Sequence, residues 1–77
     1  MPMKWTETPQ STSIARFGYD APKRVLRVVF RHEGNNVYDY LKVSAAVHQR
    51  LCKAESKGRF VTHEIKGTFA YRRVDSE

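Results

Sequence analysis

The side chains best suited to bind a ligand begin with two tyrosines near the middle of the chain. Tyr38 and Tyr40 stand two residues apart in an alternating segment, so their rings share one face of a strand. Two phenol rings on one sheet face can stack on unpaired bases of a nucleic acid. In the alternative interpretation the rings pack in the core or across strands, and only their hydroxyl groups reach a partner at the edge.

A basic set with one aromatic member fills the last third of the chain. An arginine holds a phosphate through two donors and also stacks on a base, and a tyrosine among the charges adds a ring. We therefore predict that the set binds nucleic acid together with Tyr38 and Tyr40. In the alternative interpretation the charges only solvate the surface. The set consists of Lys57, Arg59, Lys66, Tyr71, Arg72 and Arg73.

Motifs for catalysis and for metal binding are missing from the sequence. His48 and Cys52 stand four residues apart, which suits one metal ion, but a zinc site takes three or four ligands, usually with a second close pair. No serine stands in a G-x-S-x-G sequence, and glycine loops that grip phosphates or dinucleotides are absent. We expect no enzymatic activity, no cofactor and no metal.

Length and charge limit the architecture and the class of partner. The chain has 77 residues, and 14 Lys and Arg against 8 Asp and Glu give it a net charge of +6. A chain of this length supports one domain with a small core. The positive charge favours RNA or another polyanion as the partner and speeds the encounter with it.

Cysteine usage and hydropathy indicate where the protein works. Cys52 is the single cysteine, so an internal disulfide is impossible, which argues against a disulfide-stapled secreted domain. No apolar stretch follows the first residues as it does in a signal peptide, and runs such as Val28-Val29-Phe30 are too short to cross a bilayer. We expect a cytoplasmic protein that makes no contact with a membrane.

Alternation of apolar and polar residues predicts three antiparallel strands. In the clearest one, Leu26, Val28 and Phe30 line one face. Arg27 and Arg31 lie on the other face, where their long stems can cover the sheet. Proline, glycine and asparagine mark the turns between the strands. The strands span 13–19, 24–32 and 37–43, and the turns span 19–23 and 33–36.

An amphipathic helix follows the third strand. Ser44 is a good N-cap, and Val47, Leu51 and Ala54 recur behind it at helical spacing. The opposite side of the helix is polar. We expect this helix to pack on the sheet and to end at Gly58 through a left-handed cap.

The rest of the chain predicts a short helix and a closing strand. Val61, Ile65 and Phe69 repeat at helical spacing, Gly67 ends this second helix, and a strand follows over 69–74. The predicted fold is therefore α+β. It is a small antiparallel sheet of three to four strands, in the order strand, strand, strand, helix, helix, strand, with an amphipathic helix and a short second helix packed on it.

The domain boundaries follow from composition. Residues 1–12 are polar with two prolines, and we expect a loosely ordered lead-in there, with Trp5 covering the edge of the core. The single domain spans 13–74, and the tail 75–77 is expected to fray.

The chain resembles the KTSC domain, a small module at the C-terminus of some lysyl-tRNA synthetases that also occurs as a stand-alone bacterial or phage protein. The resemblance implies the fold and suggests RNA as the partner. Asp39 departs from the usual basic residue of the family, and its charge would weaken phosphate contact between the tyrosines. The resemblance is carried by Lys4-Trp5, Ser11-Thr12-Ser13-Ile14, Phe17-Gly18-Tyr19-Asp20, Leu26-Arg27-Val28-Val29-Phe30, Tyr38-Asp39-Tyr40, 43–47, Leu51, Ala54, Ser56, Gly58, Ile65-Lys66 and Tyr71-Arg72-Arg73-Val74.

These observations predict a nucleic-acid-binding module, for RNA before DNA, without catalytic activity. Basic side chains would supply affinity through phosphates, and exposed tyrosines would stack on bases. The alternative is a protein-interaction or self-associating module that uses a sheet edge or the tyrosine face.

Overall fold

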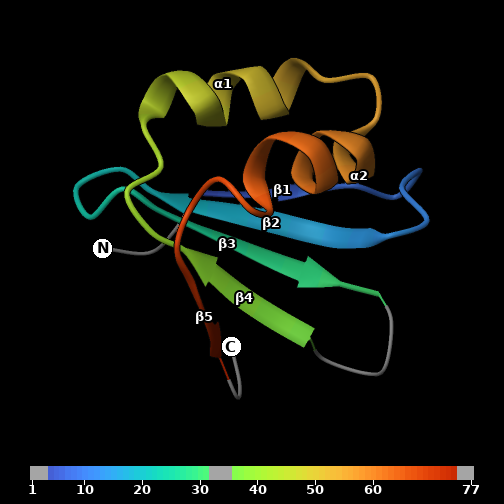
Figure 1. The fold of residues 1–77 in the computed structure, drawn as a ribbon. Coiled ribbons are helices and arrows are strands. Elements are labelled where there is room, and N and C mark those ends of the chain that lie inside the picture. The colour runs from blue at the N-terminus through green and yellow to red at the C-terminus, as the bar shows by residue number, and fades with distance from the viewer. Residues whose placement is uncertain (1–3, 32–35, 75–77) are drawn as a thin grey trace.

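A computed structural model describes residues 4–31 and 36–74 and shows an antiparallel sheet with helices on one face (Figure 1). Strands adjacent in sequence pair in the order β1-β2-β3-β4-β5. The predicted α+β class with packed helices is confirmed. The elements are β1 (Lys4–Glu7), β2 (Ile14–Asp20), β3 (Val25–Phe30), β4 (Asn36–Tyr40), α1 (Ala45–Lys53), α2 (Lys57–Phe60), its continuation as a wider π-type turn η1 (Val61–Ile65), and β5 (Tyr71–Val74).

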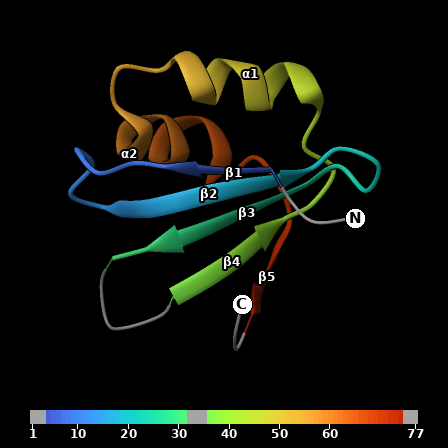
Figure 2. The same ribbon diagram turned by 180° about the vertical axis from the view of Figure 1, so that it is seen from behind.

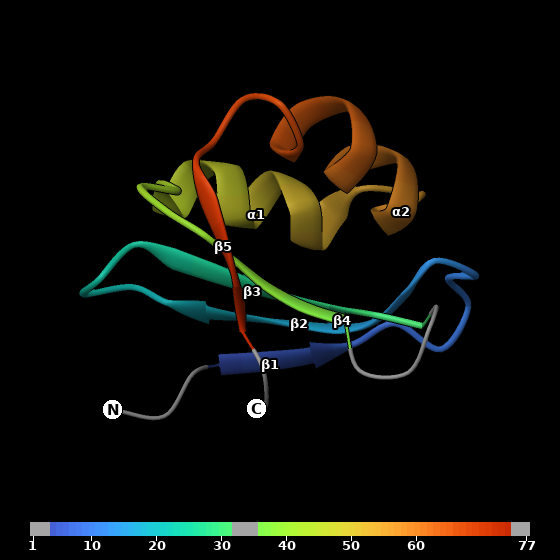
Figure 3. The ribbon, with the colours of Figure 1, turned by 60° about the horizontal axis from the view of Figure 1, so that its bottom comes forward.

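The helices cover the sheet unevenly. Figures 1 and 2 view the molecule from opposite sides, and both show α1 and α2 together over one face of the sheet. Figure 3 shows the twist of the sheet, in which β5 runs steeply across the direction of β1 and β2. On the helix-side face, Phe17 of β2 and Val28 of β3 are fully buried, whereas Tyr71 of β5 is 61% exposed, so the helices cover β5 less than β2 and β3.

The core lies between the helices and the sheet. Leu51 is the buried residue of α1, and Val61 and Ile65 are the buried residues of η1. The Tyr19 hydroxyl donates to the Val43 carbonyl oxygen and ties β2 to the segment before α1. The core cluster comprises Ile14, Phe17, Tyr19, Leu26, Val28, Tyr40, Val43, Leu51, Val61 and Ile65.

The sheet has five strands among the described residues instead of the predicted three to four. The additional strand, β1, lies in the segment expected to be a loose lead-in and pairs with β2 from Lys4 opposite Tyr19 to Glu7 opposite Arg16. Trp5 is 38% exposed, and the Arg16 guanidinium lies 4.8 Å from its ring centroid. Periodicity cannot identify so short a strand, because its formation depends on pairing with β2.

The first helix begins where predicted and ends earlier. The Ser44 hydroxyl oxygen accepts a hydrogen bond from the Val47 amide, which confirms the N-cap. The predicted left-handed cap at Gly58 is wrong, because α1 ends at Lys53 and Gly58 lies inside α2. The Lys57 ammonium supplies the missing cap by donating to the carbonyl oxygens at the C-terminus of α1.

The other predicted elements are present with shifted ends: the third predicted strand ends at Tyr40 instead of residue 43, and the closing strand begins at Tyr71 instead of residue 69. Gly67 follows η1 with a φ of 81°, a conformation that favours glycine, and turns the chain toward β5. The predicted turn over 33–36 and the tail 75–77 lie largely or wholly outside the described residues. In the two described stretches, 4–31 and 36–74, no helix has the length and apolar character needed to cross a bilayer.

Candidate nucleic-acid interface

The structure divides the predicted binding residues among three places. Alternation and register place Tyr38, Tyr40, Tyr71 and Arg73 on the helix-side face of β4 and β5, with Lys66 just after η1. Arg72 lies on the opposite face of β5. Lys57 and Arg59 lie on α2, beside the connection between β1 and β2. The first group contains most of the predicted side chains and all of the predicted rings.

The tyrosines differ in burial. Tyr40 is a core residue with 2% of its surface exposed, so the core interpretation is correct for this ring. Burial raises the pKa of Tyr40 to about 12, and the neighbouring Tyr38 and Tyr71 also raise it. Tyr38 is half-buried, whereas Tyr71 is 61% exposed. Tyr71 is therefore the most accessible ring of the three.

Ring contacts join these tyrosines into one cluster. The Tyr71 centroid lies 5.5 Å from that of Tyr38 and 5.8 Å from that of Tyr40, at interplanar angles of 56° and 43°. Phe30 extends the cluster, since its centroid lies 5.6 Å from that of Tyr38. Such tilted and edge contacts hold the rings in place without covering one ring face fully with another.

A cavity of about 320 Å³ opens beside the rings. We call it the tyrosine pocket; it is lined by Tyr38, Tyr40, Lys66, Gly67 and Tyr71. The Lys66 Nζ atom lies 5.1 Å from the Phe30 ring centroid, a cation–π contact that holds the ammonium near the pocket. Sequence patterns indicated Lys66 and the tyrosines but missed Phe30, which the pairing of β3 with β4 places beside Tyr38, and Gly67, which follows η1.

Arg73 lies near the rings. It stands opposite Tyr38 in the pairing of β4 with β5, and its Nη2 atom donates to the Asn36 Oδ1 atom at 3.1 Å. Its side chain remains exposed. Lys66 and Arg73 therefore place two positive charges around the tyrosine cluster.

Asp39 and Arg72 belong to the face away from the helices. The Asp39 side chain is only 2% exposed and accepts two hydrogen bonds from Arg27, with Nε–Oδ1 at 2.7 Å and Nη2–Oδ2 at 3.0 Å. The Arg72 Nη2 atom lies 3.8 Å from Asp39 Oδ2. The expectation that Asp39 opposes phosphate between the tyrosines is wrong, because its carboxylate lies on the other face and pairs with arginines.

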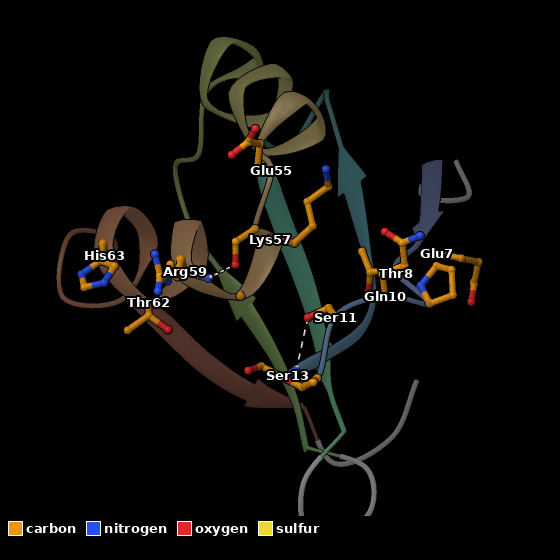
Figure 4. Close-up of a pocket in the computed structure, with 14 residues that line it drawn as sticks. Glu7, Thr8, Gln10, Ser11, Ser13, Glu55, Lys57, Arg59, Thr62 and His63 are labelled. Carbon is orange, nitrogen blue, oxygen red and sulfur yellow. Dashed lines mark hydrogen bonds between the residues drawn. The ribbon is translucent and has the colours of Figure 1, made fainter.

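Lys57 and Arg59 lie in a separate polar groove of about 520 Å³ (Figure 4). The Lys57 Nζ atom donates to the Ala54 carbonyl oxygen at 2.6 Å and to the Cys52 carbonyl oxygen at 2.9 Å, so its charge is occupied in capping α1. Arg59 is exposed, but Glu7 and Glu55 line the same groove. Hydroxyl groups dominate the walls, whose described residues include no Phe, Tyr or Trp, and His63 is the one aromatic residue among them. The groove therefore lacks the cluster of tyrosine rings that lines the tyrosine pocket.

His48 and Cys52 lie close together on α1. The Cys52 Sγ atom is 3.5 Å from the His48 Nε2 atom, and the His48 ring stacks on Tyr19 with centroids 4.5 Å apart. In the part of the chain that the structure describes, no three His, Cys, Asp or Glu side chains gather into a group that could hold a metal ion. The stacking of the His48 ring on Tyr19 packs α1 against β2.

His48 predicts a pH dependence of stability. Burial lowers the pKa of His48, and the nearby Lys4 lowers it further. Because the pKa of His48 is lower in the folded protein than in the unfolded chain, the unfolded chain binds more protons at pH values between the two. The free energy of unfolding is therefore highest above about pH 6.5, the ordinary histidine pKa, and falls as the pH drops from there through the folded-state pKa. We expect the melting temperature to fall between about pH 8 and about pH 5.5. His48→Gln should flatten this fall, and an equally steep fall in the variant would contradict the assignment.

Comparisons with known proteins agree on one family. The model of the KTSC domain matches residues 10–69. A lysine–tRNA ligase of Trichormus variabilis is 32% identical over 66 residues, which cover 86% of this chain and 11% of that enzyme. A protein of Tsukamurella paurometabola is 37% identical over 60 residues, covering 78% and 87% of the two chains. The crystal structure of a KTSC domain protein from Yersinia pestis superposes with a TM-score of 0.85 at 38% identity and covers 95% and 99% of the two chains.

Proposed function

This chain belongs to the KTSC domain family, and we propose that it is a nucleic-acid-binding module without catalytic activity, with RNA as its ligand. The observation that carries the proposal is the grouping of exposed Tyr71 with Lys66 and Arg73 at the tyrosine pocket. The combination of rings with cations is the usual chemistry of single-strand binding. The net charge of +6 supports attraction to a polyanion.

The relatives support the partner class only in part. One of them is named a lysine–tRNA ligase, a name that links that enzyme to a transfer RNA. The chain spans only 11% of that enzyme. We therefore propose that this domain binds nucleic acid, and we do not assign the ligase reaction to it. In our proposal the domain supplies contacts to RNA and leaves any reaction to other proteins.

Affinity in this proposal comes from the phosphates. Lys66 and Arg73 form no salt bridge with another described residue, so both charges face solvent and phosphate oxygens can reach them. Arg72 contributes less, because the Asp39 carboxylate is 3.8 Å away, and Lys57 contributes less because it caps α1. This ranking rests on the neighbours of each side chain in the structure, which the sequence did not reveal.

Salt dependence tests the proposal. We expect a labelled single-stranded RNA to bind in polarisation titrations and to lose affinity steeply between about 50 and 200 mM salt. Because each phosphate contact to a single strand contributes about 0.7 to the slope of log K against log salt, Lys66→Ala with Arg73→Ala should reduce the slope by about 1.4.

The control variant must remove the same charge elsewhere. Lys23 and Lys53 are exposed and lie outside the tyrosine pocket, so Lys23→Ala with Lys53→Ala should change the slope much less. Absence of binding to RNA and to DNA near physiological salt would overturn the proposal. It would leave the alternative of a protein-interaction module, for which the open edges of β1 and β5 provide the surface.

A further inference from the structure

The Tyr71 ring, the most accessible ring of the tyrosine pocket, is not stacked flat against either neighbouring tyrosine ring. Tyr71 meets Tyr38 and Tyr40 at angles of 56° and 43°, so neither ring lies flat against it. With 61% of its surface exposed, Tyr71 presents ring area to solvent at the mouth of the pocket. A large exposed aromatic ring beside a cavity is suited to receive a second flat ring.

The size and lining of the pocket limit what that ring can be. A volume of about 320 Å³ lies at the lower end of the range for ligand pockets, enough for one base with its sugar. A base inside a duplex is covered on both faces by its neighbours and has its edge paired. It cannot enter between Tyr71 and the turn at Gly67 unless it leaves the stack.

The charges are placed for the backbone on either side of such a base. Lys66 lines the pocket, and its ammonium is held over the Phe30 ring. Arg73 lies two residues beyond Tyr71 on the same face of β5, with its guanidinium anchored at Asn36. The polar groove of Lys57 and Arg59 has His63 as the one aromatic residue among its described lining residues and is also lined by Glu7 and Glu55, whose charges oppose phosphate, so its chemistry differs.

We propose that the tyrosine pocket captures one unpaired base of a single-stranded RNA by stacking on Tyr71, while Lys66 and Arg73 hold the adjacent phosphates. This inference rests on the proposed nucleic-acid-binding function and narrows it. Duplex RNA and a polyanion without bases engage only the charges and therefore bind more weakly.

Three probes separate stacking from charge. A single-stranded RNA of about eight nucleotides, its duplex, and inorganic polyphosphate are titrated against the full chain at one salt concentration. We expect the single strand to bind about 10-fold more tightly than the duplex. Tyr71→Ala should weaken single-strand binding about 10-fold and leave duplex and polyphosphate binding unchanged, whereas Tyr71→Phe should keep the preference.

Two results overturn the inference in different ways. Equal binding of single strand and duplex, or a preference that survives Tyr71→Ala, rejects base capture while salt-dependent binding still supports the proposed function. No binding of any of the three probes rejects the proposed function and the inference together. Tyr71 is mostly exposed, so the variant is expected to fold, and its melting curve verifies this.

Discussion

Replacing Asp39 with alanine is expected to destabilise the fold by about 3–5 kcal/mol, the largest effect we predict for a polar side chain. The carboxylate is 2% exposed and receives two hydrogen bonds from Arg27, whose own side chain is 23% exposed. Removing the carboxylate takes away the acceptor of two charge-assisted hydrogen bonds from the partly buried Arg27 guanidinium, and losing such bonds in a buried ion pair is costly. A loss of this size is a large fraction of the total stability of a small domain.

The control for this experiment is an exposed ion pair. The Arg50 Nη2 atom lies 3.6 Å from Glu64 Oε1, and their side chains are 63% and 48% exposed. Arg50→Ala should cost at most about 1 kcal/mol, because solvent screens such a pair. Urea unfolding curves measure both variants. Similar losses for Asp39→Ala and Arg50→Ala would show that the Arg27–Asp39 pair does not stabilise the sheet as we describe.

The second large expected effect is a difference in stability between alanine variants of Tyr40 and Tyr71. Tyr40→Ala should destabilise the domain by about 3–5 kcal/mol, since it removes a ring from the core and leaves a cavity. Tyr71→Ala should cost about 0.5–1.5 kcal/mol, because only its contacts to two neighbouring rings are lost. Both values come from denaturant unfolding.

A conservative variant checks the cause. Tyr40→Phe keeps the ring and should retain most of the stability, whereas a loss close to that of Tyr40→Ala would assign the effect to the hydroxyl group. Equal losses for Tyr40→Ala and Tyr71→Ala would contradict the difference in burial on which the candidate site depends.

Much of the fold was predictable because local patterns were strong. Leu26, Val28 and Phe30 alternate over a full strand, and Ser44 caps a helix whose apolar residues recur on one side. β1 was missed because four residues carry too little periodicity, and its partner strand lies across the turn at Pro9. The end of α1 was missed because a Lys57 side chain performs the capping that a glycine usually provides.

The candidate site was harder to predict than the fold. The spacing of Tyr38 and Tyr40 shows that they share one face of a strand, but it does not show which face of the sheet the helices cover. The sequence therefore left open whether Tyr38 and Tyr40 were exposed for stacking or packed in the core. The strand ends at Tyr40, and Lys42 adopts a φ of 59°. The alternation of side chains between the two faces therefore stops before Val43, and Val43 packs in the same core as Tyr40. The register of β5, which separates Arg72 from Arg73, depends on pairing between distant segments.

The most direct test of the proposed interface is to map backbone amide shifts by NMR while a single-stranded RNA is added to the labelled protein. We expect the largest shifts, with a common saturation point, at the amides of Lys66, Gly67, Tyr71 and Arg73. The reporters outside the pocket are Arg59 in the polar groove and Trp5 on β1, which should change little. Shifts concentrated at Arg59 and the β1–β2 connection, or no shifts at all, would contradict the assignment of the tyrosine pocket as the binding site.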